Sequence, residues 1–152
     1  MSPLNQALIT RKIQQVTEDL KKLTPYSRLT PAQYLSDDQS QLIVERLLER
    51  LIGRIIDINF HLLKEVFDDL PQDYYQSFKK MAQHQVLDQS LAQDLAPAAA
   101  TRNILAHQYD EVDPRQIYQA MKKAVTLIPR YLSQIQKKIA SPIQEPRTGG
   151  VS

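Results

Sequence analysis

Side chains that could carry out chemistry gather in one short stretch of this chain. The stretch contains the polar residues Arg102, Asn103, His107 and Tyr109, with the small residue Ala106 between them. On an α-helix with about 3.6 residues per turn these side chains share one arc, in which Tyr109 lies about 20° from Arg102. The other side of the helix carries aliphatic residues that can anchor it to a core. The spacing therefore predicts a shallow polar pocket on one face of a helix.

These residue types suit the cleavage of a phosphodiester bond in RNA. His107 has a side chain that titrates near neutral pH, so it can remove the proton of a 2′-hydroxyl or protonate the departing 5′-oxygen. Arg102 is permanently charged and can grip a phosphate, which stabilises the anion that forms during the reaction. Asn103 can orient the histidine or hold a phosphate oxygen. Because RNA supplies its own nucleophile, such a site needs no metal and no cofactor.

The same spacing also fits a helix end that has no catalytic role. In that interpretation Arg102 forms an ion pair with Asp110 or Glu111, and His107 is present by chance. The pattern of an arginine five residues before a histidine occurs often, so spacing alone does not choose between the two interpretations.

The other two histidines have structural explanations. His61 follows Asp57 by four residues on a predicted helix, which favours a hydrogen bond between the two side chains. A supporting role for this pair near a site also stays open. His84 lies near a predicted helix end, where we expect it to be exposed. No two histidines have the spacing of a metal site, so we expect no metal.

The composition excludes several classes of protein. The 152 residues contain no cysteine, which excludes a disulfide framework, a thiol nucleophile and a cysteine-based zinc site. With three glycines, the chain lacks the glycine-rich loops that bind phosphates in nucleotide-binding folds. No apolar run approaches the ~18–20 residues of a membrane span, and no signal peptide is visible. We therefore expect a cytoplasmic protein. The net charge of +2 neither demands nor excludes a nucleic-acid partner.

Apolar residues recur with helical spacing along most of the chain, which predicts an all-α protein, an antiparallel bundle of about five helices. We assign residues 1–140 to one helical-bundle domain and residues 141–152 to a flexible tail. Pro71 should end the second long helix, Pro97 should kink or split the fourth, and Pro129 should bend the last. The predicted helices span residues 4–23, 39–67, 73–84, 88–108 and 114–140, with a short helical turn after Thr30.

The second predicted helix, over residues 39–67, is apolar around much of its circumference. Asp37 or Asp38 can cap its first turn. Its expected inward-facing row includes Leu42 and Ile43, and further apolar residues widen the arc, namely Leu48, Ile52, Ile56 and Leu63. A helix of this kind lies in the centre of a bundle or at a subunit interface. We favour an isologous homodimer that buries this face.

The stretch from Arg102 to Tyr109 matches the Rx4HxY signature of HepT-like HEPN toxins, the ribonuclease halves of HEPN/MNT toxin–antitoxin pairs. The run from Tyr74 to Pro114 and the long helix also resemble this family, so the similarity covers roughly residues 8–140. The arginine, the adjacent asparagine, the histidine and the tyrosine of the family pattern are all present. The tail resembles nothing informative.

The resemblance implies the HEPN fold and a small toxin of a type VII-like toxin–antitoxin system that dimerises, with two motifs in a cleft near the two-fold axis. It implies a metal-independent endoribonuclease acting on cellular RNA, either tRNA or mRNA, with Arg102, Asn103 and His107 as catalytic residues. The implied partner is an MntA-like minimal nucleotidyltransferase antitoxin, which neutralises the toxin by transferring AMP to Tyr109. The resemblance also makes a larger hetero-oligomer of toxin and antitoxin possible.

Two alternatives belong to other classes of protein. The chain could be a non-catalytic helical subunit that binds a nucleotide or acts as an adaptor for a nucleotidyltransferase. It could also be a plain helical scaffold, in which Arg102 and His107 affect nothing but stability. Incubation of the purified protein with RNA in EDTA separates these readings from a nuclease.

Overall fold

The computed structural model describes residues 3–140, and all its regular elements within that range are helices, as predicted. The side chains of Pro3, Leu4 and Tyr109 lie outside this description, as does the predicted tail, residues 141–152. No strand occurs within the described residues. The elements are α1 (Pro3–Leu23), η1 (Thr24–Arg28), α2 (Pro31–Leu35), α3 (Asp38–Glu65), α4 (Tyr74–Gln83), α5 (Gln89–Leu95), α6 (Ala98–His107), η2 (Tyr109–Glu111) and α7 (Pro114–Ala140), where η marks a 3-10 helix.

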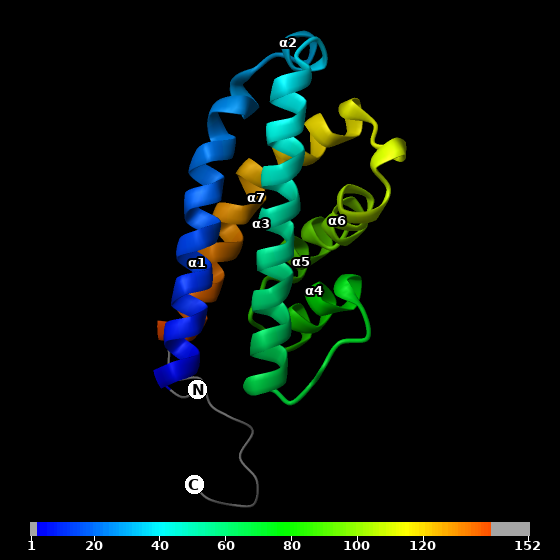
Figure 1. Cartoon of the computed structure of the whole chain (residues 1–152). Coiled ribbons are helices and arrows are strands. Elements are labelled where there is room, and N and C mark those ends of the chain that lie inside the picture. Colours follow the sequence, from blue (N-terminus) through cyan, green and yellow to red (C-terminus); the bar gives the residue numbers. More distant parts are fainter. Residues whose placement is uncertain (1–2, 141–152) are drawn as a thin grey trace, which may run out of the picture.

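The 28-residue helix α3 is the centre of the bundle. It runs antiparallel to α1, packs against α7, and contacts α4 and α6 on its other side (Figure 1). Of the two predicted caps, Asp37 is the one that forms, because its carboxylate accepts hydrogen bonds from the backbone N–H groups of Gln39 and Ser40. Every helix that contributes to the candidate site is therefore positioned against α3.

The broad apolar arc of α3 is explained by this central position. Leu48, Ile52 and Ile56 are buried within the single chain, so the prediction that they form a subunit interface is wrong. Leu42 and Ile43 were expected to face inward, but their side chains are 69% and 39% exposed. They lie in the first two turns of α3, whereas the core closes around the helix from Val44 onward.

The C-terminal end of α3 differs from the prediction. The helix ends at Glu65, well before Pro71, because Asp68 adopts a left-handed conformation with φ of 48° and Asp69 donates its N–H to the carbonyl of Leu63. The carboxylate of Asp69 is then held by Lys80 and by His84 at the end of α4.

His84 is not the freely exposed residue that its place near a helix end suggested. Its ring stacks on Phe67 with centroids 4.3 Å apart, and its Nε2 lies 2.8 Å from the carboxylate of Asp69. The hydrogen bonds from Lys80 and from His84 lower the pKa of Asp69. This cluster fixes the chain between α3 and α4.

The predicted hydrogen bond between Asp57 and His61 is absent from the described residues. Asp57 is exposed and lies 3.9 Å from Lys12 of α1, whereas Nε2 of His61 is buried without a hydrogen-bond partner. Burial lowers the pKa of His61, although Glu65 opposes the shift. The two side chains are four residues apart on α3, but one turns to solvent and the other turns into the bundle.

Proline shapes the second half of the chain. Pro97 splits the predicted fourth helix into α5 and α6, because it has no N–H to continue the hydrogen-bond ladder. α7 begins at Pro114, as predicted, and continues through Pro129. The split gives α6 its own direction and leaves it only ten residues long.

A buried polar network joins three helices. The Tyr131 hydroxyl of α7 lies 2.6 Å from Oδ1 of Asn59 and 3.0 Å from the carbonyl of Ile55, both on α3. Nδ2 of Asn59 donates to Ser77 Oγ of α4 at 3.1 Å, and that hydroxyl donates to the carbonyl of Tyr74 at 2.7 Å. All three polar side chains are buried. The network therefore fixes the first turn of α4 relative to α3 and α7.

We predict that Asn59→Ala lowers the free energy of unfolding by about 2–4 kcal/mol, since it removes two buried hydrogen bonds and leaves a cavity. Urea denaturation monitored by circular dichroism provides the measurement, and the slope with urea concentration should not change. Gln136→Ala, which removes an exposed amide from α7, is the control and should shift stability by less than about 0.5 kcal/mol. Equal stability of the two variants would contradict the role assigned to the network.

Candidate functional site

The short helix α6 carries three of the four motif residues. Leu105 is buried and anchors this helix to the core, as does Ala99, whereas Asn103 and His107 are exposed and Arg102 is half-buried. The predicted division into an anchoring side and a polar side is therefore confirmed for Leu105, Asn103 and His107, but Ala99 is buried although the helical wheel places it on the polar side.

The helix ends sooner than the wheel argument assumed. His107 is the last residue of α6, and Gln108 leaves the helical region with φ of −132° and ψ of 53°. Tyr109 begins the 3-10 turn that leads to α7. The predicted angle of about 20° between Tyr109 and Arg102 is wrong, because no helix continues to Tyr109.

Arg102 lies at a junction of three helices. The carbon of its guanidinium is 5.7 Å from the centre of the Tyr74 ring of α4, which is a cation–π contact. Its Nε lies over Gly53 of α3, and a Cβ added to Gly53 would be 3.8 Å from that nitrogen. No ion pair joins Arg102 to Asp110 or Glu111 among the described residues, so the ion pair of the non-catalytic interpretation does not form.

Arg102 contributes to a pocket of about 260 Å³ that we call the arginine pocket. Three more arginines line this pocket, namely Arg46, Arg50 and Arg54. They are four residues apart on α3, so they form one row along that helix. The remaining walls include Tyr74, Gly53 and two carboxylates. The lining residues are Arg46, Glu49, Arg50, Gly53, Arg54, Ile56, Asp57, Tyr74 and Arg102.

Carboxylates offset part of the charge in the arginine pocket. Asp19 of α1 is 1% exposed and pairs with both Arg50, at 3.2 Å, and Arg54. Glu49 lies 3.4 Å from Arg46. Arg102 has no carboxylate partner in the described part of the chain, so its guanidinium is free to bind a phosphate.

Asn103 faces a different pocket. This second pocket, of about 550 Å³, is lined by Tyr74 and Tyr75 of α4 and by small residues of the α5–α6 region. Tyr74 lines both pockets, with Arg102 in the first and Asn103 in the second. His107 lines neither pocket. The single polar pocket predicted from the sequence is therefore two adjacent pockets, because neighbouring residues on a helix point about 100° apart.

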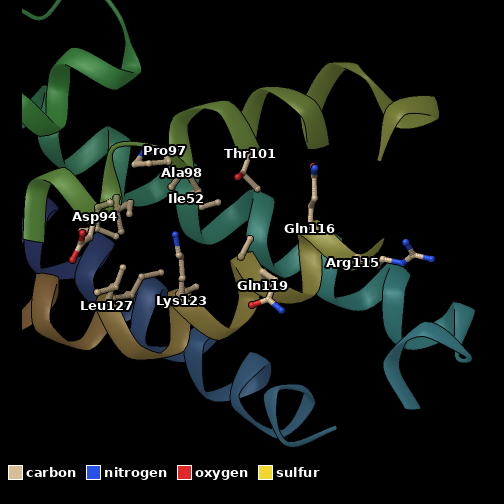
Figure 2. Close-up of a pocket in the computed structure, with 15 residues that line it drawn as sticks. Ile52, Asp94, Pro97, Ala98, Thr101, Arg115, Gln116, Gln119, Lys123 and Leu127 are labelled. Atoms are coloured by element: carbon tan, nitrogen blue, oxygen red, sulfur yellow. The ribbon is translucent and has the colours of Figure 1, made fainter. Parts of the chain in front are cut away.

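A third cavity, of about 370 Å³, lies between α3, α6 and α7, and its lining is mostly apolar (Figure 2). Thr101 reaches it from α6, and Gln119 and Lys123 reach it from α7. It contains none of the four motif residues, and no pattern in the sequence pointed to it.

Sequence reasoning missed Tyr74 and Gly53 as parts of the site. The spacing of Arg46, Arg50 and Arg54 can be read from the sequence, but their closeness to Arg102 cannot. Within the described residues, no group of three or more His, Cys, Asp or Glu side chains could hold a metal ion. None of the described helices is both long and apolar enough to span a bilayer.

Comparisons with known proteins identify the family. The family model described as "Ribonuclease HepT-like" matches residues 7–135. The chain belongs to the HepT-like family. It is 30% identical over 145 residues to the tRNA nuclease HepT of Aphanizomenon flos-aquae, an alignment that covers 95% of this chain and 99% of the relative. The resemblance inferred from the motif and its flanks is thus confirmed.

Solved structures share the HepT-like fold. A toxin–antitoxin complex with AMP-PNP superposes with a TM-score of 0.77 at 22% identity, covering 86% of this chain and 98% of the other. A tri-AMPylated HEPN toxin of Shewanella oneidensis in complex with an MNT antitoxin gives 0.76 at 23% identity, with 90% and 99% covered. The cytosolic protein YutE of Bacillus subtilis, of unknown function, gives 0.78 at 18% identity, with 94% and 95% covered. At these identities the likeness shows the fold alone.

Gly53 allows a direct test of the packing around Arg102. Gly53→Ala should raise the free energy of unfolding by about 0.5–1 kcal/mol, because alanine favours a helix interior and its Cβ would make an ordinary contact with Arg102. Gly53→Leu should displace the guanidinium, which a shift of the Arg102 side-chain NMR resonance would report, while Gly53→Ala leaves that resonance near its original position. Destabilisation by alanine would show that the space above Gly53 is already filled.

Proposed function

We propose that this HepT-like chain is the toxin of a toxin–antitoxin pair and a metal-independent endoribonuclease that cleaves tRNA or mRNA. The observation that supports this most is Arg102, whose unpaired guanidinium lies beside three further arginines in one pocket. The relative named tRNA nuclease HepT favours tRNA as the substrate. RNA and a toxin of this kind would meet in the cytoplasm.

In this proposal the reaction is an internal displacement at phosphorus. His107 removes the proton of the 2′-hydroxyl, the 2′-oxygen attacks the adjacent phosphorus, and the 5′-oxygen leaves and takes up a proton. The products are a 2′,3′-cyclic phosphate and a 5′-hydroxyl. Arg102 stabilises the negative charge that grows on the phosphate oxygens, and Asn103 holds the substrate next to it.

The same chemistry favours a homodimer. The attacking and leaving oxygens lie on opposite sides of the phosphorus, so a base and an acid are needed on opposite sides. The polar face of α6 offers a single histidine, His107. A second copy of the chain, related by a two-fold axis, would supply the other histidine, and exposed apolar residues such as Leu42 remain available for its interface.

The position of His107 is also compatible with a non-catalytic binding function. Because His107 lines neither pocket, the chain could bind a nucleotide or RNA without cleaving it, as an adaptor subunit of a nucleotidyltransferase. Binding of RNA without cleavage, in the presence of EDTA, would favour this adaptor function.

Arg102→Ala and His107→Ala should each abolish growth inhibition and RNA cleavage while leaving the protein folded. Loss of a general acid–base group typically reduces the rate by about 10²–10⁴, and loss of a charge-stabilising donor by about 10²–10³. Cleavage of purified tRNA in EDTA, with circular dichroism to verify folding, is the measurement. Arg130→Ala removes an exposed arginine from α7 and is the matched control, with activity unchanged. Full activity in a folded motif variant would refute the catalytic assignment.

Static light scattering tests the homodimer. We expect twice the chain mass of 17.5 kDa at micromolar concentration. A mixture of Arg102→Ala and His107→Ala protomers should regain part of the cleavage activity if each two-fold site draws residues from both copies. A monomer mass at that concentration would exclude the dimer.

We further propose that an MntA-like nucleotidyltransferase antitoxin neutralises the chain by transferring AMP to Tyr109. Tyr109 follows His107 by two residues, so the added phosphodiester would repel the RNA backbone and its nucleoside would crowd the histidine. A larger hetero-oligomer of toxin and antitoxin fits this regulation.

Intact mass spectrometry after co-expression with an MntA-like nucleotidyltransferase antitoxin should show mass additions in AMP-sized steps. These additions should vanish in Tyr109→Phe, whose ring retains the size of tyrosine but has no hydroxyl to accept AMP. An inhibited toxin without any added mass would instead indicate that the antitoxin simply covers the site.

A further inference from the structure

The first turn of α4 exposes two consecutive aromatic rings. Tyr74 and Tyr75 are 37% and 43% exposed, although burial of each ring would be favourable. Both line the second pocket, together with Asn103 and a floor of small residues, namely Ala96, Pro97, Ala99 and Ala100. Aromatic walls over a floor of small side chains leave room for a flat group.

This pocket lies directly beside the arginine pocket. Tyr74 borders both, Arg102 packs over its ring, and Asn103 is the next residue along α6. For a ligand that places a phosphate near Arg102, the second pocket is therefore the neighbouring space that can take a group attached to that phosphate. In RNA the attached group is a nucleoside.

The carboxylate at the edge of the second pocket disfavours a second phosphate and leaves room for a neutral planar group. Asp73 at its edge carries a carboxylate, which caps α4 by accepting a hydrogen bond from the N–H of Gln76 at 2.7 Å. Lys79 lies over the Tyr75 ring at 5.2 Å and occupies one face of that ring. The Asn103 amide offers both a donor and an acceptor, which suits the edge of a base.

The ring of Tyr74 is held in place before any ligand binds. It meets Phe60 of α3 edge-on, with centroids 5.9 Å apart and planes at 83°. Its carbonyl accepts the hydrogen bond from Ser77 that ends the buried Asn59 network. A wall that is already ordered loses little entropy when a base stacks beside it.

We propose that Tyr74, Tyr75 and Asn103 form a subsite that binds one unpaired nucleobase of the RNA by stacking, next to the phosphate held by Arg102. This inference rests on the proposed ribonuclease function. It assigns the substrate region at the site to single-stranded RNA, since a paired base is not free to enter a pocket walled by aromatic rings.

The test measures binding of a short single-stranded RNA by fluorescence anisotropy, in the His107→Ala background so that the RNA stays intact. A second RNA of the same length has abasic residues throughout. Tyr75→Leu should weaken binding of the normal RNA by about 5- to 150-fold, the range expected for loss of one stacked base. Binding of the abasic RNA should change little. Tyr75→Phe keeps the ring and should bind both RNAs like the parent.

Arg46→Ala is the matched control on the neighbouring pocket. It removes a phosphate-binding charge and should weaken both RNAs equally, with a shallower dependence on salt. Tyr75→Leu should leave the salt dependence unchanged.

Two results would overturn the subsite. Equal weakening of both RNAs by Tyr75→Leu would show that the ring contacts the backbone. No effect on either RNA, combined with loss of antitoxin binding, would show that the tyrosines dock a protein. Cleavage activity of the chain with native His107 is measured separately: if it is absent while base-dependent binding persists, the nuclease function fails and the subsite stands.

Discussion

One buried asparagine connects the parts of the bundle that position the candidate site. Asn59 bonds to Tyr131 of α7 and to Ser77 of α4, and Ser77 in turn holds the carbonyl of Tyr74. A buried polar group is costly unless its hydrogen bonds are made, so this arrangement is favourable only when the three helices meet in one way. The backbone of Tyr74, whose ring contacts Arg102, takes its position from that requirement.

Electrostatics in the arginine pocket follow from the same packing. Three arginines of α3 lie in a row, and Asp19 of α1 neutralises part of their charge by pairing with Arg50 and Arg54. Arg102 enters from α6 across Gly53, the one position on that side of α3 without a Cβ. The result is a guanidinium that is supported by an aromatic ring rather than by a carboxylate. Such an arginine keeps its hydrogen-bonding capacity for a phosphate.

Proline and a short helix determine how far the motif extends. Pro97 precedes the first residue of α6 and separates this helix from α5. The helix ends at His107, because the backbone of Gln108 leaves the helical conformation. Arg102 and Asn103 therefore lie on a rigid element packed on α3. Tyr109 belongs to the following 3-10 turn instead, a position that fits the proposed modification of its hydroxyl by a partner enzyme.

The sequence by itself determined the helical class, an interruption at Pro97, an aspartate cap at residue 37 or 38 and the family, because each depends on neighbouring residues or on a short motif. The tertiary structure alone decided which faces are covered. It buried Leu48, Ile52 and Ile56 within one chain, left Leu42 exposed and turned Asp57 away from His61. It also placed Tyr74, 28 residues before Arg102, in the lining of two pockets, and it divided Arg102 and Asn103 between them, although a helical wheel had put both in one pocket. Helical periodicity fixes the angle of a side chain about its own axis, but the neighbours it meets depend on how separate helices pack.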